Sequence, residues 1–465
     1  MVLTQQHIEQ ISSSSFRILE QIGVCIDNDV LRQKALKAGA KPGKRSNSVC
    51  FPEKMIGEYL SLAPSAARFA DCRGNITLMQ PGTEPKFWTG AALNYISGSQ
   101  SHAITSGDLA QFTRIADSLP TVYATVGTSI DDIVPTARDF VGFRIMAQNT
   151  HKHIRPLLFT PKGVKPILEM AQVIAGGKPL AQCPLVSFGY SCLSPLHWSN
   201  IPVEMWIQSS GHKIPVMVNG EPISGSTSPV TLAGSIALSN AEILAGVIFL
   251  QLLEPGRPAI YNLGFAHTTD MRSGTCLSGS AECALMAYTG GRLAAYYNLP
   301  SASWMCTDSF MDDQQAAIEK VLTGMAHTLG GINVIWGMGQ LQSQKALSAS
   351  QLVMDNEVAL ALLRYNRGFE INEETLAYRV INDVVEKGGD FLSSDHTMDH
   401  FRNELSESPL LARTNRDKWE SQGAQSLCDK ADAYVKELLS NPAEPCLTDS
   451  QLSEIMKIEK TALKL

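Results

Sequence analysis

The chain has 465 residues, of which 44% are hydrophobic and 18% charged, and its formal net charge is -7. These values are typical of a folded globular protein and exclude an intrinsically disordered one, whereas the length allows one large catalytic domain or two to three average domains. The acidic balance argues against nucleic acid as a partner, since no basic cluster occurs beyond Lys41 to Arg45.

The first residues contain no basic segment followed by an apolar one, so we expect a cytoplasmic protein without a secretory signal. Ten cysteines are scattered without a Cys-x-x-Cys spacing, which predicts buried reduced thiols rather than disulfides. Residues 1–80 combine an amphipathic segment, His7 to Ile22, with an extended piece around Val49 to Pro52. They predict an N-terminal helical and extended layer outside the main fold.

Apolar runs rich in β-branched and aromatic residues recur eight times along residues 81–365. The runs are Phe87 to Ile96, Thr121 to Val126, Ile154 to Phe159, Leu185 to Tyr190, Ile214 to Val218, Ala259 to Leu263, Ala302 to Cys306 and Ile332 to Trp336. Segments with helical periodicity follow each run. Continuous apolar strands are typical of parallel sheets that are buried on both faces. The eight alternations predict an α/β fold, a (β/α)₈ TIM barrel.

An open doubly wound sheet is the alternative, but it would need a glycine-rich phosphate turn after its first strand, and no Gly-x-Gly-x-x-Gly is present. The apolar stretch Val230 to Leu253 reaches membrane length, yet Ser235, Asn240 and Glu242 interrupt it. We expect a buried helix there and no membrane span. Residues 366–465 become polar and charged and predict a C-terminal helical extension packed on the barrel, which is also a candidate for contacts in a homo-oligomer.

Active sites of such barrels lie at the carboxyl ends of the strands, so the residues that follow each run are the candidates. They combine aromatic rings with isolated carboxylates, the groups that hold a quaternary ammonium ion, which has no N–H to donate. The candidates are Asn94, Tyr95, Asn219, Glu221, His267, Arg272, Trp304, Asp308, Phe310 and Trp336. Plain packing in the barrel mouth is an equal explanation for Tyr95, Trp304 or Trp336.

Metal sites find little support in the sequence. His151-x-His153 resembles a ligand pair, but a third ligand is not evident, and His153 begins the third strand at the bottom of the barrel, where a structural histidine is the better interpretation. No His-Glu-x-x-His or Gly-x-Ser-x-Gly motif occurs. The carboxylates of Asp312-Asp313 could form a metal or acid/base pair, but they open a helix, and stabilising its dipole is the better interpretation. Asp355-Asn356-Glu357 lies in the last barrel helix, with its carboxylates facing either the barrel mouth or solvent.

Several sequence blocks resemble the trimethylamine methyltransferase family. They are Gly225 to Gly246 with Gln251 to Pro258, Thr307-Asp308-Ser309 with Asp313 and Gln314, Gly330-Gly331, Leu352 to Glu357, and Gly388 to Leu392 with His396-Thr397. The resemblance covers essentially the whole chain. Members of this family are barrels that move a methyl group from an amine to the cob(I)alamin of a separate corrinoid protein, so the resemblance implies that activity, cofactor and partner.

One departure refines the expectation. The founding members carry pyrrolysine in the barrel, whereas this chain has only standard residues and is similar to members that act on quaternary amines such as glycine betaine, proline betaine or carnitine. A quaternary ammonium departs as a neutral tertiary amine, so no metal or general acid is needed, and catalysis would come from alignment. Because the chain lacks an Asp-x-His-x-x-Gly signature, we expect the corrinoid on the partner protein and none bound tightly here.

The resemblance and the strand-end positions together suggest roles. A cation cage is expected from Tyr95, Trp336 and Phe310 with Trp304 behind them, and a carboxylate field from Asp308 or Glu221. A betaine carboxylate would be held by Arg272, His267, Asn94 and Asn219. Two alternatives stay open, a metal-assisted barrel lyase or hydrolase of a small amine, and a non-catalytic protein that binds a quaternary ammonium compound.

Overall fold

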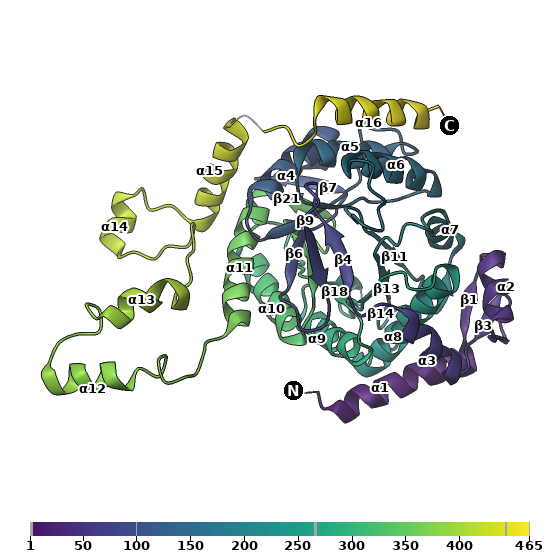
Figure 1. Cartoon of the computed structure of the whole chain (residues 1–465), viewed down its shortest axis with the longest axis horizontal. Coiled ribbons are helices and arrows are strands. Elements are labelled where there is room, and N and C mark those ends of the chain that lie inside the picture. The colour runs from purple at the N-terminus through teal and green to yellow at the C-terminus, as the bar shows by residue number, and fades with distance from the viewer. Residues whose placement is uncertain (1–2, 99, 265–266, 442–443, 465) are drawn as a thin grey trace.

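Eight parallel strands form a barrel at the centre of the molecule (Figure 1). The computed structural model describes residues 3–98, 100–264, 267–441 and 444–464. The barrel strands are β6 (Lys86–Thr89), β9 (Val122–Val126), β10 (His153–Arg155), β11 (Phe188–Ser191), β13 (Val216–Asn219), β15 (Ala259–Asn262), β18 (Ser301–Trp304) and β19 (Val334–Met338). The sheet closes where Ile154 bridges Val186, just before β11. The predicted (β/α)₈ fold is therefore confirmed.

A helix follows each barrel strand and covers its outer face. These helices are α4 (Ser106–Ser118), α5 (Arg138–Asn149), α6 (Val164–Ile174), α7 (Asn200–Gln208), α8 (Leu232–Leu253), α9 (Ala281–Tyr296), α10 (Gln314–Gly330) and α11 (Ala349–Arg367). A 3₁₀ turn, η2 (Pro161–Gly163), precedes α6. Polar side chains fix helix starts, as where the Asp313 carboxylate caps α10 by accepting from the Ala316 N–H at 3.1 Å. This agrees with the expected role of that acidic pair.

The acidic residues of α11 were predicted to face either the barrel mouth or solvent, but they are buried. Asp355 and Lys320 of α10 form a fully buried ion pair with a 2.9 Å separation of Nζ and Oδ2. The same carboxylate accepts from the Gly339 N–H and from Gln351, both at 2.7 Å. Asp355 therefore ties two helices to the end of β19, because a buried charge is tolerated only where opposite charge and hydrogen bonds surround it.

The apolar helix α8 is a core element. It is long and apolar enough to cross a membrane by length and composition, but 89% of its most apolar window is buried inside the protein. One side packs on β13 and β15, and the other is covered by the N-terminal layer. That layer consists of α1 (Gln5–Arg17), a π-helical turn η1 (Ile18–Ile22), β1 (Val24–Ile26), α2 (Asp29–Lys37), β2 (Lys41–Pro42), β3 (Ser48–Cys50) and α3 (Glu53–Leu62), with β12 (His197–Trp198) pairing with β1.

A hairpin closes the amino-terminal end of the barrel. Its strands are β4 (Ala67–Ala70) and β5 (Ile76–Met79), and Phe69 and Met79 pack with the inward side chains of the barrel. His153 lies beneath it, with Nδ1 2.9 Å from the Ala70 carbonyl oxygen and Nε2 2.8 Å from Ser187 Oγ. Burial lowers the pKa of His153 to about 4. This histidine is a satisfied structural residue, as its position in the sequence predicts.

Two small sheets form the rim at the opposite, carboxyl end. One contains β7 (Asn94–Ser97), β8 (Gln100–Ala103), β20 (Gln340–Leu341) and β21 (Ala346–Ser348), and the other contains β14 (Ile223–Ser224), β16 (His267–Asp270) and β17 (Thr275–Leu277). The first predicted strand, Phe87 to Ile96, is therefore divided between the barrel and the rim. The chain leaves the barrel at Gly90, where any Cβ would overlap the Gln340 side chain.

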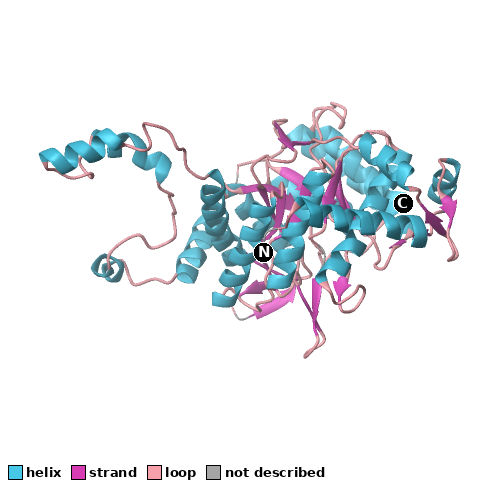
Figure 2. Ribbon diagram, turned by 90° about the horizontal axis from the view of Figure 1, so that it is seen from below, coloured by secondary structure: helices cyan, strands magenta, loops and turns pink. Residues whose placement is uncertain are grey.

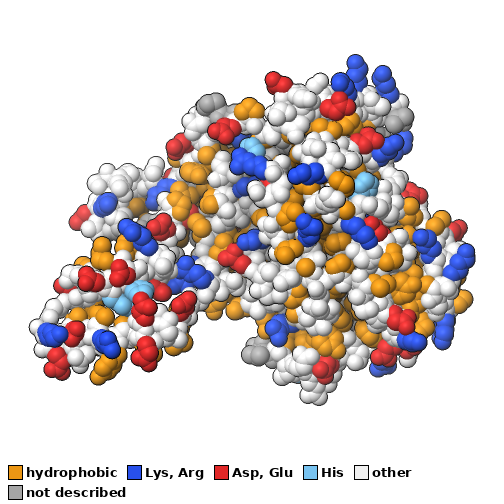
Figure 3. Space-filling model, in the orientation of Figure 1, with side chains coloured by type: hydrophobic (Ala, Val, Ile, Leu, Met, Phe, Trp, Pro, Cys, Tyr) orange, Lys and Arg blue, Asp and Glu red, His pale blue; other side chains and the backbone are white. Residues whose placement is uncertain are grey.

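The C-terminal region begins as an arm that stands away from the barrel in both ribbon views (Figures 1 and 2). It contains α12 (Tyr378–Lys387), α13 (Asp395–Glu404) and α14 (Arg416–Ser421), none of which has a buried residue. In Figure 3 the arm is a lobe of mixed acidic and basic side chains at the left. The prediction of an extension packed on the barrel does not hold here, because the chain turns outward at Gly368 (φ 65°) after α11.

The last two helices return to the barrel. α15 (Leu427–Ser440) packs on α11 and α4, and α16 (Asp449–Ala462) packs on α6 and α5. Arg144 of α5 donates to Glu459 of α16 at 2.5 Å, and both side chains are mostly buried. The extension therefore packs on the barrel through these two helices and through the segment before them, where Leu410 contacts the core and Ser408 bonds to Glu357 of α11.

Candidate active site at the carboxyl ends of the strands

Three tryptophans gather inside the barrel, and we refer to Trp88, Trp304 and Trp336 as the tryptophan cluster. Trp304, the last residue of β18, is paired with Trp336 in the middle of the neighbouring strand β19, and their ring centroids are 4.9 Å apart at 68°. Trp88 is stacked with Trp336 at 5.9 Å. Trp336 is fully buried, whereas Trp304 keeps 7% of its surface exposed. Among these rings, Trp304 is the one that faces the mouth.

Arg155, the last residue of β10, lies inside the barrel against this cluster. Its guanidinium carbon is 4.2 Å from the Trp336 ring centroid, and the residue is only 5% exposed. Its Nε finds no hydrogen-bond partner among the described residues, and no described carboxylate contributes to its pKa, which burial lowers to about 10. The guanidinium is thus charged at neutral pH and has no anionic partner among the residues that the structure describes, which is a costly arrangement for a buried group.

A row of polar side chains occupies the strands on the other side of the barrel. Asn262 donates to Asn219 Oδ1 at 2.9 Å, and Asn219 donates to Ser191 Oγ at 3.3 Å. These residues end β15, β13 and β11 in matching register. The mouth is therefore aromatic at β18, β19 and β6 and polar at β11, β13 and β15, with Arg155 on a strand between the two parts.

Two glutamates lie behind the polar row. Burial raises the pKa of Glu221, which a hydrogen bond from Ser191 opposes. Burial also raises the pKa of Glu242 of α8 to about 7, while its carboxylate accepts from the Leu196 N–H and Ser194 Oγ, both at 2.8 Å. Glu242 therefore holds the loop after β11, and of these two acids Glu221 is the one that the sequence places at the mouth.

Asp308 connects three loops. Its carboxylate accepts from the backbone N–H groups of Ser278 and Gly279 at 2.9 and 3.0 Å and from Ser343 Oγ at 2.7 Å. Burial lowers the pKa of nearby His267 to about 4, and Asp308 counteracts this only in part. His267 is therefore neutral at pH 7, and the hydrogen bonds of Asp308 are used to hold the loops after β15, β18 and β19.

The other residues singled out from the sequence lie on the rim. Tyr95 and Asn94 belong to β7; burial raises the pKa of Tyr95 to about 12, and Asn94 Nδ2 donates to the Lys345 carbonyl at 3.3 Å. Phe310 is 77% exposed. The Arg272 side chain is 91% exposed at the β16–β17 turn, where it pairs with Asp270 at 3.1 Å. The structure thus brings Trp304, Trp336 and Asn219 together inside the barrel and separates Arg272 from them.

Sequence reasoning missed Arg155. The signal was present, since Ile154 to Phe159 is an apolar run in which a single arginine occupies an inward position of the strand. The run predicts a strand, but the arginine within it was not recognised as a candidate site residue. A charged residue inside such a run is unusual and indicates either a buried ion pair or a ligand contact.

Exposed apolar side chains surround the mouth. One lies in each of the first seven loops that follow the barrel strands, namely Leu93, Val134, Phe159, Leu193, Val230, Met271 and Phe310. We call this set the apolar rim. A ring of exposed apolar residues around a polar and aromatic opening is typical of a surface that another protein covers.

Among the described residues, one group of His, Cys, Asp or Glu side chains is close enough to hold a metal ion, and it consists of Asp117, His151 and Cys446. Asp117 ends α4 and His151 precedes β10, so the group lies at the amino-terminal end of the barrel. The metal-assisted alternative would require such a group at the mouth, and the described residues provide none there.

Comparison with known proteins places the whole chain in one family. The family model described as trimethylamine methyltransferase matches residues 1–461. A trimethylamine methyltransferase of Desulfitobacterium hafniense is 30% identical over 94% of this chain and 89% of its own length. A glycine betaine methyltransferase from another strain of that species is 29% identical over 96% of this chain and 94% of its own length.

A solved structure supports the fold. The monomethylamine methyltransferase of Methanosarcina barkeri superposes with a TM-score of 0.59 over 100% of this chain and 87% of its own, at 13% sequence identity. This likeness concerns the backbone arrangement and is independent of the side chains at the mouth.

Proposed function

Since the chain belongs to the trimethylamine methyltransferase family, we propose that it transfers a methyl group from a carboxylate-bearing quaternary amine, such as glycine betaine, to the corrinoid of a separate protein. The observation that carries the substrate class is Arg155, a buried cation without a described anionic partner beside an aromatic cluster. A betaine carries both the carboxylate that such an arginine binds and the methylammonium that an aromatic ring accepts.

In the bound complex the carboxylate occupies the open side of the Arg155 guanidinium and receives charge-assisted hydrogen bonds. Asn219 and Asn262, which already form a hydrogen-bonded row, supply further amide groups on the polar side. The trimethylammonium group then lies toward Trp304, the least buried member of the tryptophan cluster. Holding both ends of a small zwitterion in this way fixes the direction of its N–methyl bond.

The corrinoid of the partner supplies a cobalt(I) nucleophile that accepts the methyl group. The chain's own contribution is alignment, because the amine leaves with the electron pair of the broken carbon–nitrogen bond and needs no proton. Neutral His267 and the loop-bracing Asp308 fit this role, since neither places a free acid against the leaving nitrogen. A limited number of ring contacts is also suitable, because the ammonium charge disappears as the bond breaks.

The apolar rim supports docking of the corrinoid protein over the mouth. Seven loops present apolar side chains there, and the substrate site lies directly beneath them. A partner that covers this ring would exclude water from the reacting groups and bring its cofactor to the end of the barrel.

The deciding experiment is methyl transfer with a corrinoid protein that is kept as cobalt(I). Glycine betaine, proline betaine, carnitine, γ-butyrobetaine, choline and trimethylamine are tested in parallel, and the demethylated amine is measured. We expect release of a tertiary amine from one or more carboxylate-bearing compounds and at least about tenfold less from choline, which lacks one charge-assisted contact. Turnover of trimethylamine alone would refute the proposed substrate class, and binding without turnover would favour the non-catalytic alternative.

A further inference from the structure

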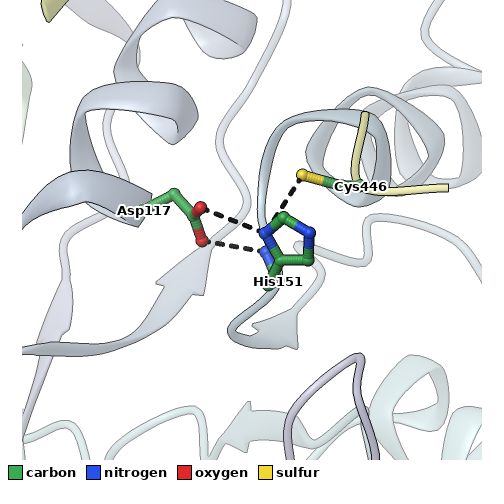
Figure 4. A group of neighbouring side chains, drawn as sticks. All are labelled: Asp117, His151 and Cys446. Atoms are coloured by element: carbon green, nitrogen blue, oxygen red, sulfur yellow. Dashed lines mark hydrogen bonds and ion pairs between the residues drawn. The ribbon is translucent and has the colours of Figure 1, made fainter. Parts of the chain in front are cut away.

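Three side chains from distant parts of the chain meet at the closed end of the barrel, opposite the active site. Asp117 comes from the end of α4, His151 from the turn before β10, and Cys446 from the segment that leads into α16 (Figure 4). His151 Nδ1 lies 3.3 Å from Asp117 Oδ2 and 3.5 Å from Cys446 Sγ. All three potential ligand atoms lie within 4.8 Å of one another.

The two distances from His151 Nδ1 match edges of a zinc coordination tetrahedron. With Zn–N and Zn–O bonds of about 2.1 Å and a Zn–S bond of about 2.3 Å, tetrahedral angles give edges of about 3.4 Å between N and O and about 3.6 Å between N and S. The observed separations of 3.3 and 3.5 Å agree with both edges. The third edge, between the Asp117 carboxylate and Cys446 Sγ, lies within 4.8 Å, against about 3.6 Å in the tetrahedron. Binding of a single ion therefore draws these two side chains together by up to about 1.2 Å.

The protein also holds the ligands in position. Asp117 Oδ1 accepts from the His151 backbone N–H at 2.8 Å and from Thr150 Oγ1 at 2.7 Å, which leaves Oδ2 directed at the His151 ring. The Asp117 and His151 side chains are 25% and 21% exposed. One side of the cluster opens into a cavity of about 260 Å³, so a water molecule can complete the coordination.

The charges around the cluster permit a cation. Arg73, Arg114 and Glu444 line the same cavity, but Arg114 points its guanidinium at the carbonyl groups of Leu438 and Asn441. The Asp117 carboxylate and a Cys446 thiolate would together balance a divalent ion. A mixed set of imidazole, thiolate and carboxylate suits zinc and not magnesium or calcium, which prefer oxygen ligands only.

We propose that Asp117, His151 and Cys446 bind a zinc ion that fastens the C-terminal segment to the amino-terminal end of the barrel. On binding, the Cys446 S–H bond is replaced by a sulfur–zinc bond and the proton is released to solvent. His151 donates the lone pair of Nδ1 and keeps its proton on Nε2, and no electrons are transferred. The sequence pair His151-x-His153 thus contributes one ligand, since His153 is occupied inside the barrel.

The ion has a structural role in this arrangement. Cys446 lies three residues before α16, a helix that otherwise depends on packing against α5 and α6 and on the Arg144–Glu459 pair. The β4–β5 hairpin separates the cluster from the tryptophan cluster. Zinc at this place therefore acts on the attachment of the C-terminal helix and not on methyl transfer.

The test uses the full-length chain, stripped of metal by a chelator and reconstituted with zinc or cobalt(II). We expect about one metal ion per chain and, with cobalt, the charge-transfer absorption of a thiolate ligand and the visible bands of tetrahedral coordination. Cys446→Ser should abolish the charge-transfer band. Zinc should also raise the thermal midpoint of the wild type and slow proteolytic removal of α16, with neither effect in the variant.

Cys428→Ser is the matched control, because Cys428 is a half-buried cysteine of the same C-terminal region whose Sγ contacts the Asp312 carbonyl and no histidine. It should keep the full metal content and absorption. Retention of the thiolate band in Cys446→Ser would overturn the proposal, as would a wild type that takes up no metal, which would leave the cluster a hydrogen-bonded one. These readouts do not involve methyl transfer and stand apart from the proposed activity.

Discussion

Replacing Arg155 by methionine tests the carboxylate anchor directly. Methionine fills a similar volume against Trp336 but has neither charge nor donors. Loss of the charge-assisted hydrogen bonds to a carboxylate costs about 3 kcal/mol, or roughly two orders of magnitude in Kd. We therefore expect glycine betaine to bind about a hundredfold more weakly to Arg155→Met.

The same substitution should not destabilise the fold. Burial lowers the pKa of Arg155 to about 10 from the ordinary 12.5, so the folded protein keeps this group charged at a cost of about 3 kcal/mol. Removing the charge is therefore expected to raise the free energy of unfolding, as is found when unpaired buried charges give way to apolar residues. A variant with lower affinity for glycine betaine and a higher free energy of unfolding cannot have lost binding through misfolding.

The assay is calorimetric titration of both proteins with glycine betaine and with choline, which has the same trimethylammonium group and a hydroxyl in place of the carboxylate. The wild type should prefer glycine betaine, and Arg155→Met should lose that preference while its affinity for choline stays within about threefold. Thermal unfolding provides the second measurement. An equal loss for both ligands, or an undiminished preference for glycine betaine, would refute the role of Arg155.

Three other substitutions separate the remaining parts of the mechanism. In Gly189→Ala the new Cβ would overlap Arg155 Nη2 and displace it, so betaine binding should weaken by about tenfold or more while choline binding is kept. Phe310→Ser on the apolar rim should raise the KM for the corrinoid protein about tenfold and leave amine affinity unchanged, as steady-state kinetics with varied partner concentration would show. Burial raises the pKa of Glu242 to about 7, so its folded state favours the protonated acid and stability falls as the pH rises from about 4.5 to 7. Glu242→Gln should therefore be more stable than the wild type at pH 8, by as much as about 3 kcal/mol, and not at pH 4; unfolding curves that run parallel at both pH values would contradict this.

The barrel could be predicted because its strands are recognisable from the local amino-acid sequence alone. Each inner strand is apolar on both faces, so the eight runs stand out without knowledge of what they contact. The same reasoning identified α8 as a core helix from Asn240 and Glu242 inside an apolar stretch, and both residues are fully buried. Burial of whole elements can thus be inferred from residue types alone.

The site was less predictable because side-chain contacts depend on the closed barrel. Trp336 was expected in a cation cage, but two of its contacts, Arg155 and Trp88, come from strands more than 180 residues away in the sequence. Arg272 was expected to bind a carboxylate, but a hairpin turn places it beside Asp270. Cys446 could not be joined to His151 at all, because nothing in the sequence indicates where the chain returns after the arm.

The β4–β5 hairpin covers the amino-terminal end of the barrel and leaves the carboxyl end as the route of access. Because Phe69 and Met79 fill the amino-terminal end, a substrate that reaches the tryptophan cluster would enter through the mouth, which the proposed corrinoid partner would also cover. If the proposed docking is correct, the amine enters before the corrinoid protein docks, and the demethylated product leaves after that protein dissociates. Such docking predicts an ordered mechanism, in which excess corrinoid protein inhibits turnover by covering the mouth before the amine has entered.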